Sequence, residues 1–231
     1  GEVQNSKSAR PILPKSNVAT SAIKTLKEFD GKQLLRSYGV AVPVGDVCKP
    51  QDAVDRASKF DGPVVMKVSS ANVAHKTEAG GVVLNLTNAR EIEAAANQLA
   101  KITDEVLIER MVTGAVAELI IGVTRDPQFG LGLVIGAGGI LTELLADTAT
   151  LLLPTNRNEI ESALKSLKVW KLIEGFRGKS GDEEAVIAAV EAIAKFANAH
   201  ANTLEELDVN PLLVLPKGAV AVDALLRLRT A

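Results

Sequence analysis

The chain has 231 residues, of which 47 % are hydrophobic and 23 % charged, so it can bury a sizeable core as one large domain or two small ones. The formal net charge of −2 and the aromatic content of 3 % argue against the basic, base-stacking surface of a nucleic-acid-binding protein. One cysteine excludes intrachain disulfides, and no apolar run reaches the roughly 18 residues of a membrane span, so we expect a cytoplasmic protein that binds no membrane.

The first part of the chain predicts a flexible lead-in followed by short elements. Residues 1–20 are polar and mildly basic and contain two prolines, which is typical of a tether. Apolar residues recur at helical spacing over 21–38, and Gly39 suits a C-terminal cap. A strand is predicted over 40–47, and a short helix over 49–60.

The run VVMKV predicts a buried strand over 64–68 that carries Lys67. Burial of an unpaired charge is costly, so Lys67 either reaches water at the strand end or contacts a ligand such as phosphate. The loop VAHKTEAGGVV follows, with His75 and the glycine pair Gly80 and Gly81. Imidazole is a competent nucleophile near neutral pH, so His75 is either an ordinary surface histidine or a phosphoryl acceptor.

The rest of the chain predicts strands that alternate with helices. Asn88, with Glu91 three residues later, predicts the N-cap of a helix. Predicted helices cover 89–102, 157–167 and 182–201, and predicted strands cover 105–112, 115–124, 131–139, 204–215 and 219–228. The last two strands, joined by a Pro-Lys-Gly turn, predict an antiparallel hairpin. This mixture of helices and hairpins predicts a mixed α/β fold of the α+β type.

Three oxygen-bearing side chains on the predicted hairpin indicate a metal site. Asp208 and Asn210 lie two residues apart and therefore share one face of their strand, and Asp223 lies on the facing strand. Hard oxygen ligands suit Mg²⁺. Turn chemistry alone would explain the DVNP stretch. It does not explain a carboxylate in the middle of the final strand, so we favour the metal interpretation.

Together these motifs resemble an ATP-grasp nucleotide-binding fold. The segments PVVMKV, VAHKTEAGGV, IGAGGILTELLAD, GFRG and ELDVNPLLV resemble the β subunit of nucleoside-diphosphate-forming acyl-CoA synthetases, of the ADP-forming acetyl-CoA synthetase type. The resemblance runs from about residue 22 to residue 228. Succinyl-CoA synthetases have a glycine-arginine-glycine loop without histidine at this place, so His75 favours the acetyl type.

The resemblance implies two ATP-grasp subdomains with the nucleotide held between them. We expect a lead-in over 1–20, an N-terminal subdomain over 21–111 that includes the His75 loop, and a C-terminal subdomain over 112–231 with the metal site. The implied reaction is acyl-CoA + ADP + phosphate ⇌ acid + CoA + ATP. In this family the phosphoryl group passes through a histidine that matches His75.

The resemblance also implies the site residues. The implied catalytic residue is His75. The implied nucleotide-binding residues are Lys67 (phosphates), Gly80 and Gly81 (loop closure), Glu109, Met111 and Val112 (adenine), and Glu118 (ribose). The implied Mg²⁺ ligands are Asn210 and Asp223, with Asp208 beside them. Five further residues in matching motifs receive no role: Gly136, Gly138, Gly139, Glu143 and Arg177.

The resemblance further implies a partner. In the family an α-type part binds CoA and the acid, and no stretch of these 231 residues resembles it. We therefore expect an α-type CoA-binding subunit or fused domain, and a hetero-oligomer. Two other functions stay open: an ATP-grasp carboxylate ligase that forms acyl phosphate directly on its substrate, and a nucleotide-sensing domain of a fused acyltransferase.

Overall fold

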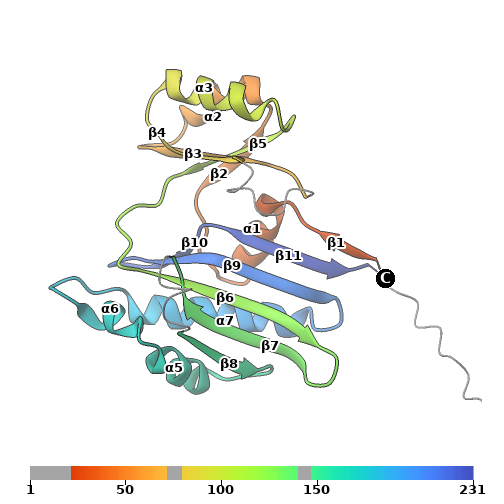
Figure 1. Cartoon of the computed structure of the whole chain (residues 1–231), viewed down its shortest axis with the longest axis vertical. Coiled ribbons are helices and arrows are strands. Elements are labelled where there is room, and N and C mark those ends of the chain that lie inside the picture. The colour runs from red at the N-terminus through yellow and green to blue at the C-terminus, as the bar shows by residue number, and fades with distance from the viewer. Residues whose placement is uncertain (1–21, 72–79, 140–146, 231) are drawn as a thin grey trace, which may run out of the picture.

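The computed structural model describes residues 22–71, 80–139 and 147–230, and these residues form two β-sheets with helices (Figure 1). The fold is mixed α/β, as the sequence predicts. In Figure 1 the small sheet lies at the top with two helices above it, and the large sheet lies below with its helices behind it. Within the described residues, no helix is long and apolar enough to cross a membrane.

The large sheet is antiparallel throughout its described pairs. Its strands are β1 (Ile23–Thr25), β6 (Ala117–Asp126), β7 (Gly130–Ala137), β8 (Thr148–Leu152), β9 (Leu204–Val214), β10 (Ala219–Ala221) and β11 (Ala224–Arg229). The spatial order is β1-β11-β9-β6-β7-β8, and β10 also pairs with β9. β9 therefore lies inside the sheet, with β6 on one side and β10 and β11 on the other.

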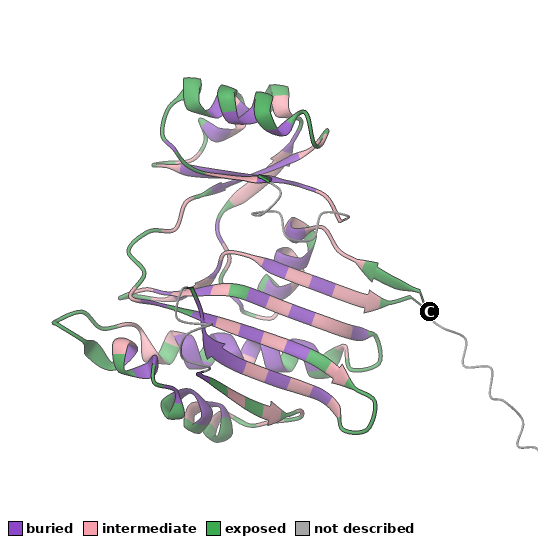
Figure 2. Cartoon of the chain, viewed as in Figure 1, coloured by how far each residue is buried: buried purple, intermediate pink, exposed green. Residues whose placement is uncertain are grey.

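One face of the large sheet is packed against helices. The helices are α5 (Arg157–Ser166), α6 (Trp170–Gly175) and α7 (Glu183–Ala199). Along β6 the buried Leu119, Ile121 and Val123 alternate with more exposed residues, and they belong to the same core cluster as Ile193 and Phe196 of α7. Figure 2 shows this alternation of buried and intermediate residues along the strands. Period-two burial means that the opposite face of the sheet is free of this core.

The small sheet has the order β2-β5-β3-β4. Its strands are β2 (Gly45–Cys48), β3 (Val64–Val68), β4 (Val82–Leu86) and β5 (Val106–Arg110), and its helices are α2 (Ala53–Ala57), preceded by a short 3₁₀ turn at Pro50–Asp52, and α3 (Ala89–Leu99). Asn88 caps α3 as predicted, because its side chain accepts the Glu91 N–H at 3.0 Å. The apolar core of this part lies between the sheet and these two helices.

The N-terminal elements differ from the prediction. The stretch 21–38 is not one helix: β1 comes first, and α1 (Glu28–Arg36) follows. β1 pairs with β11, and Leu35 of α1 belongs to the core of the large sheet. The small sheet draws its strands from 45–110, inside the expected subdomain over 21–111, whereas β1 of the same range belongs to the large sheet. The strand predicted over 40–47 is also shorter, because β2 starts at Gly45.

The terminal hairpin forms as predicted. β10 and β11 both pair with β9, and the two residues between them, Val222 and Asp223, lie opposite Asn210 and Pro211. The Asn210 N–H donates to the Asp223 carbonyl at 3.3 Å, and the Val222 N–H donates to the Pro211 carbonyl at 3.2 Å. This irregular pairing places Asp223 directly across from Asn210.

Candidate functional site

The small sheet and the large sheet meet at a buried cluster of charges. Lys67 on β3 donates to Oε1 of Glu28 at 2.6 Å and to the carbonyl oxygen of Val222 at 2.7 Å. Its Nζ also lies 3.4 Å from Oε2 of Glu109 on β5. Lys32 on α1 contacts the same three partners. Lys67 therefore does not reach water at the strand end. Its ammonium points to where the sheets meet, beside Asp223.

The environment of Lys67 keeps it charged. Burial lowers the pKa of the Lys67 ammonium, but the carboxylates of Glu28, Glu109 and Asp223 more than offset this and raise its pKa. A fixed cation at this place suits an anionic ligand such as phosphate.

The side chain of Glu109 is occupied by lysines. Its two carboxylate oxygens accept hydrogen bonds from Lys32 at 2.5 and 2.7 Å, and the side chain is buried. Glu109 therefore has its carboxylate committed, and the expected adenine contact stays a prediction for its backbone. In the following segment the Met111 N–H donates to the Pro63 carbonyl at 2.8 Å. This leaves the Met111 carbonyl and the Val112 backbone as the groups that we expect to meet adenine.

The structure brings the expected metal ligands together. Asp223 lies across from Asn210, and Asp208 is two residues before Asn210 on β9. Burial, together with the nearby carboxylates of Glu206 and Asp223, raises the pKa of Asp208. Crowded carboxylates whose mutual repulsion a cation would relieve, together with an amide oxygen, fit the hard-ligand preference of Mg²⁺. Within the described ranges, no three His, Cys, Asp or Glu side chains form a metal-binding group by themselves.

Glu118 lies one strand further, on β6, with its side chain exposed. The N–H of Gly138 donates to the Glu118 carbonyl at 2.8 Å. A Cβ at Gly138 would come within 3.1 Å of the Glu118 backbone, and one at Gly139 would come within 2.9 Å of its carboxylate. Gly138 and Gly139 therefore pack against Glu118, the residue expected to contact ribose, and a larger side chain at either position would collide with it. Gly136 lies against Thr148 instead.

The other predicted residues are less fully placed. Gly81 is buried, and its carbonyl accepts the Val68 N–H at 2.8 Å, so the glycine pair is anchored to the end of β3. Gly80 has φ +68°, a conformation that favours glycine. His75 and Glu143 lie outside the described residues. Arg177 is exposed beyond α6 and stacks on Phe176, away from the charge cluster.

Glu28 and Lys32 were not predicted from the sequence as members of the site. They stand one helical turn apart in α1, on the buried stripe with Gly31 and Leu35. The i, i+3, i+4, i+7 spacing of this stripe is the signal that could have found them, because two charged residues occupy positions where apolar ones are expected.

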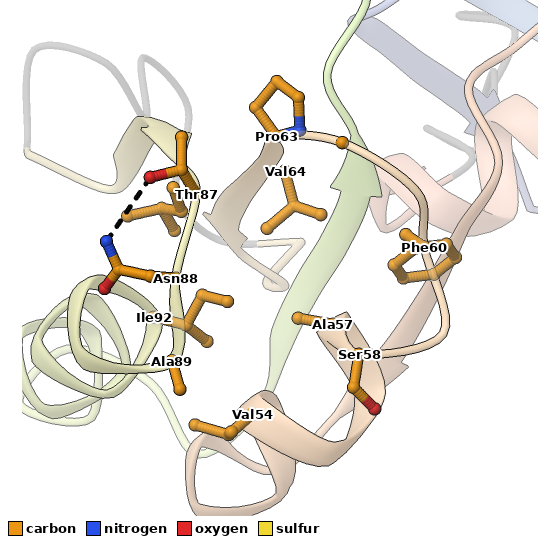
Figure 3. Close-up of a pocket in the computed structure, with 12 residues that line it drawn as sticks. Val54, Ala57, Ser58, Phe60, Pro63, Val64, Thr87, Asn88, Ala89 and Ile92 are labelled. Carbon is orange, nitrogen blue, oxygen red and sulfur yellow. Dashed lines mark hydrogen bonds between the residues drawn. The ribbon is translucent and has the colours of Figure 1, made fainter.

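A pocket of about 400 Å³ lies elsewhere, between α2 and the start of α3 (Figure 3). Val54, Val64 and Ile92 point into it, and they belong to the apolar core above the small sheet or pack against it. Lys67 alternates with Val64 and Met66 on β3, so the pocket and the charge cluster lie on opposite faces of the sheet.

Comparison with known proteins decides the family. A family model described as an ATP-grasp domain matches residues 17–228. The β subunit of ADP-forming acetate–CoA ligase II from Pyrococcus furiosus is 31 % identical over 209 residues, which cover 85 % of this chain and 89 % of that subunit. This chain belongs to the ATP-grasp family, with the β subunits of ADP-forming acetate–CoA ligases.

A second relative and a solved structure agree with this membership. The ADP-forming 4-hydroxybutyrate–CoA ligase of Nitrosopumilus maritimus is 36 % identical over 205 residues, which cover 84 % of this ATP-grasp chain but 29 % of that ligase. A structure of the acetyl-CoA synthetase 1 of Ca. Korarchaeum cryptofilum, with coenzyme A and Mg-AMPPCP, is 34 % identical. It covers 89 % of this chain and 93 % of the matched chain, with a TM-score of 0.78. Its phosphohistidine segment is described as pointing towards the nucleotide-binding site.

Proposed function

We propose that this ATP-grasp chain is the nucleotide-binding, β-type part of an ADP-forming acyl-CoA synthetase. It moves a phosphoryl group between Mg-nucleotide and His75, and so contributes to acyl-CoA + ADP + phosphate ⇌ acid + CoA + ATP. The observation that carries the proposal is the position of Lys67, which reaches from the small sheet to the Val222 carbonyl, next to Asp223 on the large sheet.

The residues at this meeting point suit phosphate chemistry. Lys67 provides a permanent cation for phosphate oxygens, and the backbone of Met111 and Val112 provides polar groups for adenine. Asn210 and Asp223, with Asp208 beside them, would hold Mg²⁺, and Glu118 would hold ribose. Bound Mg²⁺ supplies neutralisation of the negative charge on the phosphate oxygens.

His75 is the proposed acceptor. One imidazole nitrogen attacks the γ-phosphorus of ATP, the bond from that phosphorus to the bridging oxygen breaks, and ADP leaves with that oxygen. The imidazole forms a P–N bond in return, and the reverse transfer regenerates ATP from ADP. Two observations support this role: the sequence places His75 between Lys67 and Gly80, and a relative that is 34 % identical has a phosphohistidine segment.

The acyl half of the reaction belongs to a partner in this proposal. The Pyrococcus furiosus relative is named a β subunit, and the Nitrosopumilus relative is more than three times as long as the matched segment. We propose an α-type subunit or fused domain that binds CoA and the acid, in a hetero-oligomer.

The test is phosphoryl labelling. The chain, alone and with its α-type partner, is incubated with Mg²⁺ and γ-labelled ATP, and the label is tested for loss in acid and retention in base. We expect the wild type to carry acid-labile, base-stable label and His75→Ala to carry none. The matched control is His200→Gln, because His200 caps the end of α7 and stacks on Phe196. This variant should label like the wild type.

Three outcomes would contradict the proposal. Label that persists in His75→Ala would mean that the acceptor is a different residue. ADP release that requires an acid and an amine or thiol but not His75 would indicate a carboxylate ligase, whereas nucleotide binding without any transfer would indicate a sensor.

A further inference from the structure

The charge cluster contains more than the lysine that the proposed function needs. It holds two ammonium groups, Lys32 and Lys67, and two carboxylates, Glu28 and Glu109. All four residues are at most 5 % exposed. Two belong to α1, one to β3 and one to β5, so the cluster joins the α1 side of the molecule to the small sheet. Buried charges are costly unless paired, and here each carboxylate contacts an ammonium group, with Asp223 as a further negative charge near Lys67.

The two lysines are held unequally. Lys32 contacts both oxygens of Glu109, at 2.5 and 2.7 Å, and Oε1 of Glu28 at 2.7 Å. Lys67 shares the same Glu28 oxygen at 2.6 Å, but its distance to Glu109 is 3.4 Å. Glu28 and Glu109 therefore both keep Lys32 as a partner if the contact between Lys67 and Glu28 breaks.

The ammonium group of Lys67 already pairs with anions in this arrangement. It donates hydrogen bonds to Glu28 and to the Val222 carbonyl, and it forms an ion pair with Glu109 at 3.4 Å. A phosphate that approaches Lys67 therefore competes with these carboxylates for its positive charge. Glu28 is the carboxylate that Lys67 holds by a hydrogen bond, and it keeps Lys32 as a partner when that bond breaks.

We propose that Glu28 is a positioning residue that holds Lys67 in the nucleotide-free protein and competes with nucleotide phosphate for it, while Lys32 stays paired with Glu28 and Glu109 after the exchange. This inference rests on the proposed nucleotide site and adds two residues of α1 to it. The raised pKa of Lys67 agrees with it, because the exchange is then between two anions for one permanent cation.

The deciding variant is Glu28→Gln, tested on the full chain by calorimetric titration with Mg-ADP. It removes the competing anion and one negative charge from the cluster, so Mg-ADP should bind roughly tenfold more tightly. Lys32→Met does the opposite: Lys67 must then neutralise both carboxylates, and Mg-ADP should bind roughly tenfold more weakly. The double variant, Glu28→Gln with Lys32→Met, keeps Lys67 paired with Glu109. Its affinity for Mg-ADP should return towards that of the wild type.

Coupling to Lys67 separates this role from a purely structural one. In a Lys67→Met background, Glu28→Gln should no longer tighten Mg-ADP binding, because no ammonium group remains at position 67 for Glu28 and phosphate to compete for. Lys32→Arg keeps the positive charge, so it should bind Mg-ADP more like the wild type than Lys32→Met does. This comparison separates the loss of the charge from misfolding. Glu105→Gln is the matched control, since Glu105 pairs with Lys27 of the same region at 2.7 Å and touches neither Lys32 nor Lys67. It should leave Mg-ADP affinity unchanged.

Glu28→Gln that binds Mg-ADP as the wild type does, or more weakly, would overturn the inference and leave the proposed function standing. A wild-type chain that binds no Mg-ADP, alone or with its partner, would instead remove the proposed function and this inference with it.

Discussion

Strand β3 of the small sheet is buried on both faces, and the two faces meet chemically opposite partners. On one face Val64, Met66 and Ile108 belong to the apolar core with α2 and α3. On the other face Lys67 and Glu109 meet the charges of α1 and the edge of the large sheet. All five residues of β3 are buried, so burial alone does not separate the core of this sheet from its candidate site. The two faces differ in their partners. The apolar face packs on α2 and α3, and the ionic face, which carries Lys67 and Glu109, packs on the charged residues of α1.

The largest effect should come from the ionic face. Lys67→Met leaves Glu28 and Glu109 to share Lys32, so we expect the free energy of unfolding to fall by about 3–5 kcal/mol. The same variant should take no label from γ-labelled ATP. Urea unfolding and labelling measure the two effects, and Lys59→Met, at an exposed lysine of the same part of the chain, is the control. A Lys67→Met protein that labels normally would remove Lys67 from the site.

The apolar face should affect stability without affecting the site. Met66 is fully buried, and Met66→Ala should lower the free energy of unfolding by about 2–5 kcal/mol because it leaves a cavity. The folded variant should bind Mg-ADP as the wild type does, since its side chain faces away from Lys67. Urea unfolding and nucleotide titration under native conditions test this separation. A large loss of affinity would show that the two faces are not independent.

A glycine at the sheet edge gives a smaller effect on the ionic face. A Cβ at Gly45 would lie 2.6 Å from Cγ of Glu109 and 2.8 Å from the Ile108 carbonyl oxygen. We therefore expect Gly45→Ala to cost about 1–3 kcal/mol of stability and to shift Glu109 away from Lys32. Gly132→Ala is the control in thermal unfolding, because nothing lies within 4 Å of a Cβ there. Equal melting temperatures for the two variants would contradict this account.

The smallest effect should come from the partly exposed pair Lys27–Glu105, at the rim of the ionic face. The hydrogen bonds from Lys27 and then from Ser69 lower the pKa of the Glu105 carboxyl below its usual 4.5. The pair is partly exposed, so we expect Glu105→Gln to cost less than about 1 kcal/mol. A lowered pKa stabilises the fold above pH 4.5, and this contribution is lost as the pH falls through the folded-state pKa. Urea unfolding should show a larger difference between wild type and variant at pH 7 than at pH 3.

The apolar face was readable from the sequence, and much of the ionic face was not. VVMKV predicted the strand and singled out Lys67, and the oxygen-bearing side chains of the last hairpin predicted that Asn210 and Asp223 would meet. These signals are local, because they depend on strand periodicity and on one tight turn. Glu28 and Lys32 look like an ordinary surface pair of a helix until α1 is packed between the sheets.

Long-range pairing explains the other differences. Ile23–Thr25 reads as the start of a helix because its neighbours in sequence have helical spacing, yet it forms a strand whose partner lies some 200 residues later, at Arg227–Arg229. No local pattern encodes that partner. The contacts of the Glu109 carboxylate with lysines were likewise not predicted, because they depend on the position of α1. The adenine contact that the resemblance implies for the connection starting at Glu109 stays a prediction.

The pairing of β1 with β11 also bears on how this unit is built into larger proteins. Ala22 and Thr230 are joined by a backbone hydrogen bond of 2.8 Å, so the path into the fold and the path out of it run side by side. A unit with adjacent ends can be inserted into a longer polypeptide without stretching its core or rethreading its sheets. The same architecture can therefore serve as a nearly complete subunit in Pyrococcus furiosus and as 29 % of a single ligase chain in Nitrosopumilus maritimus.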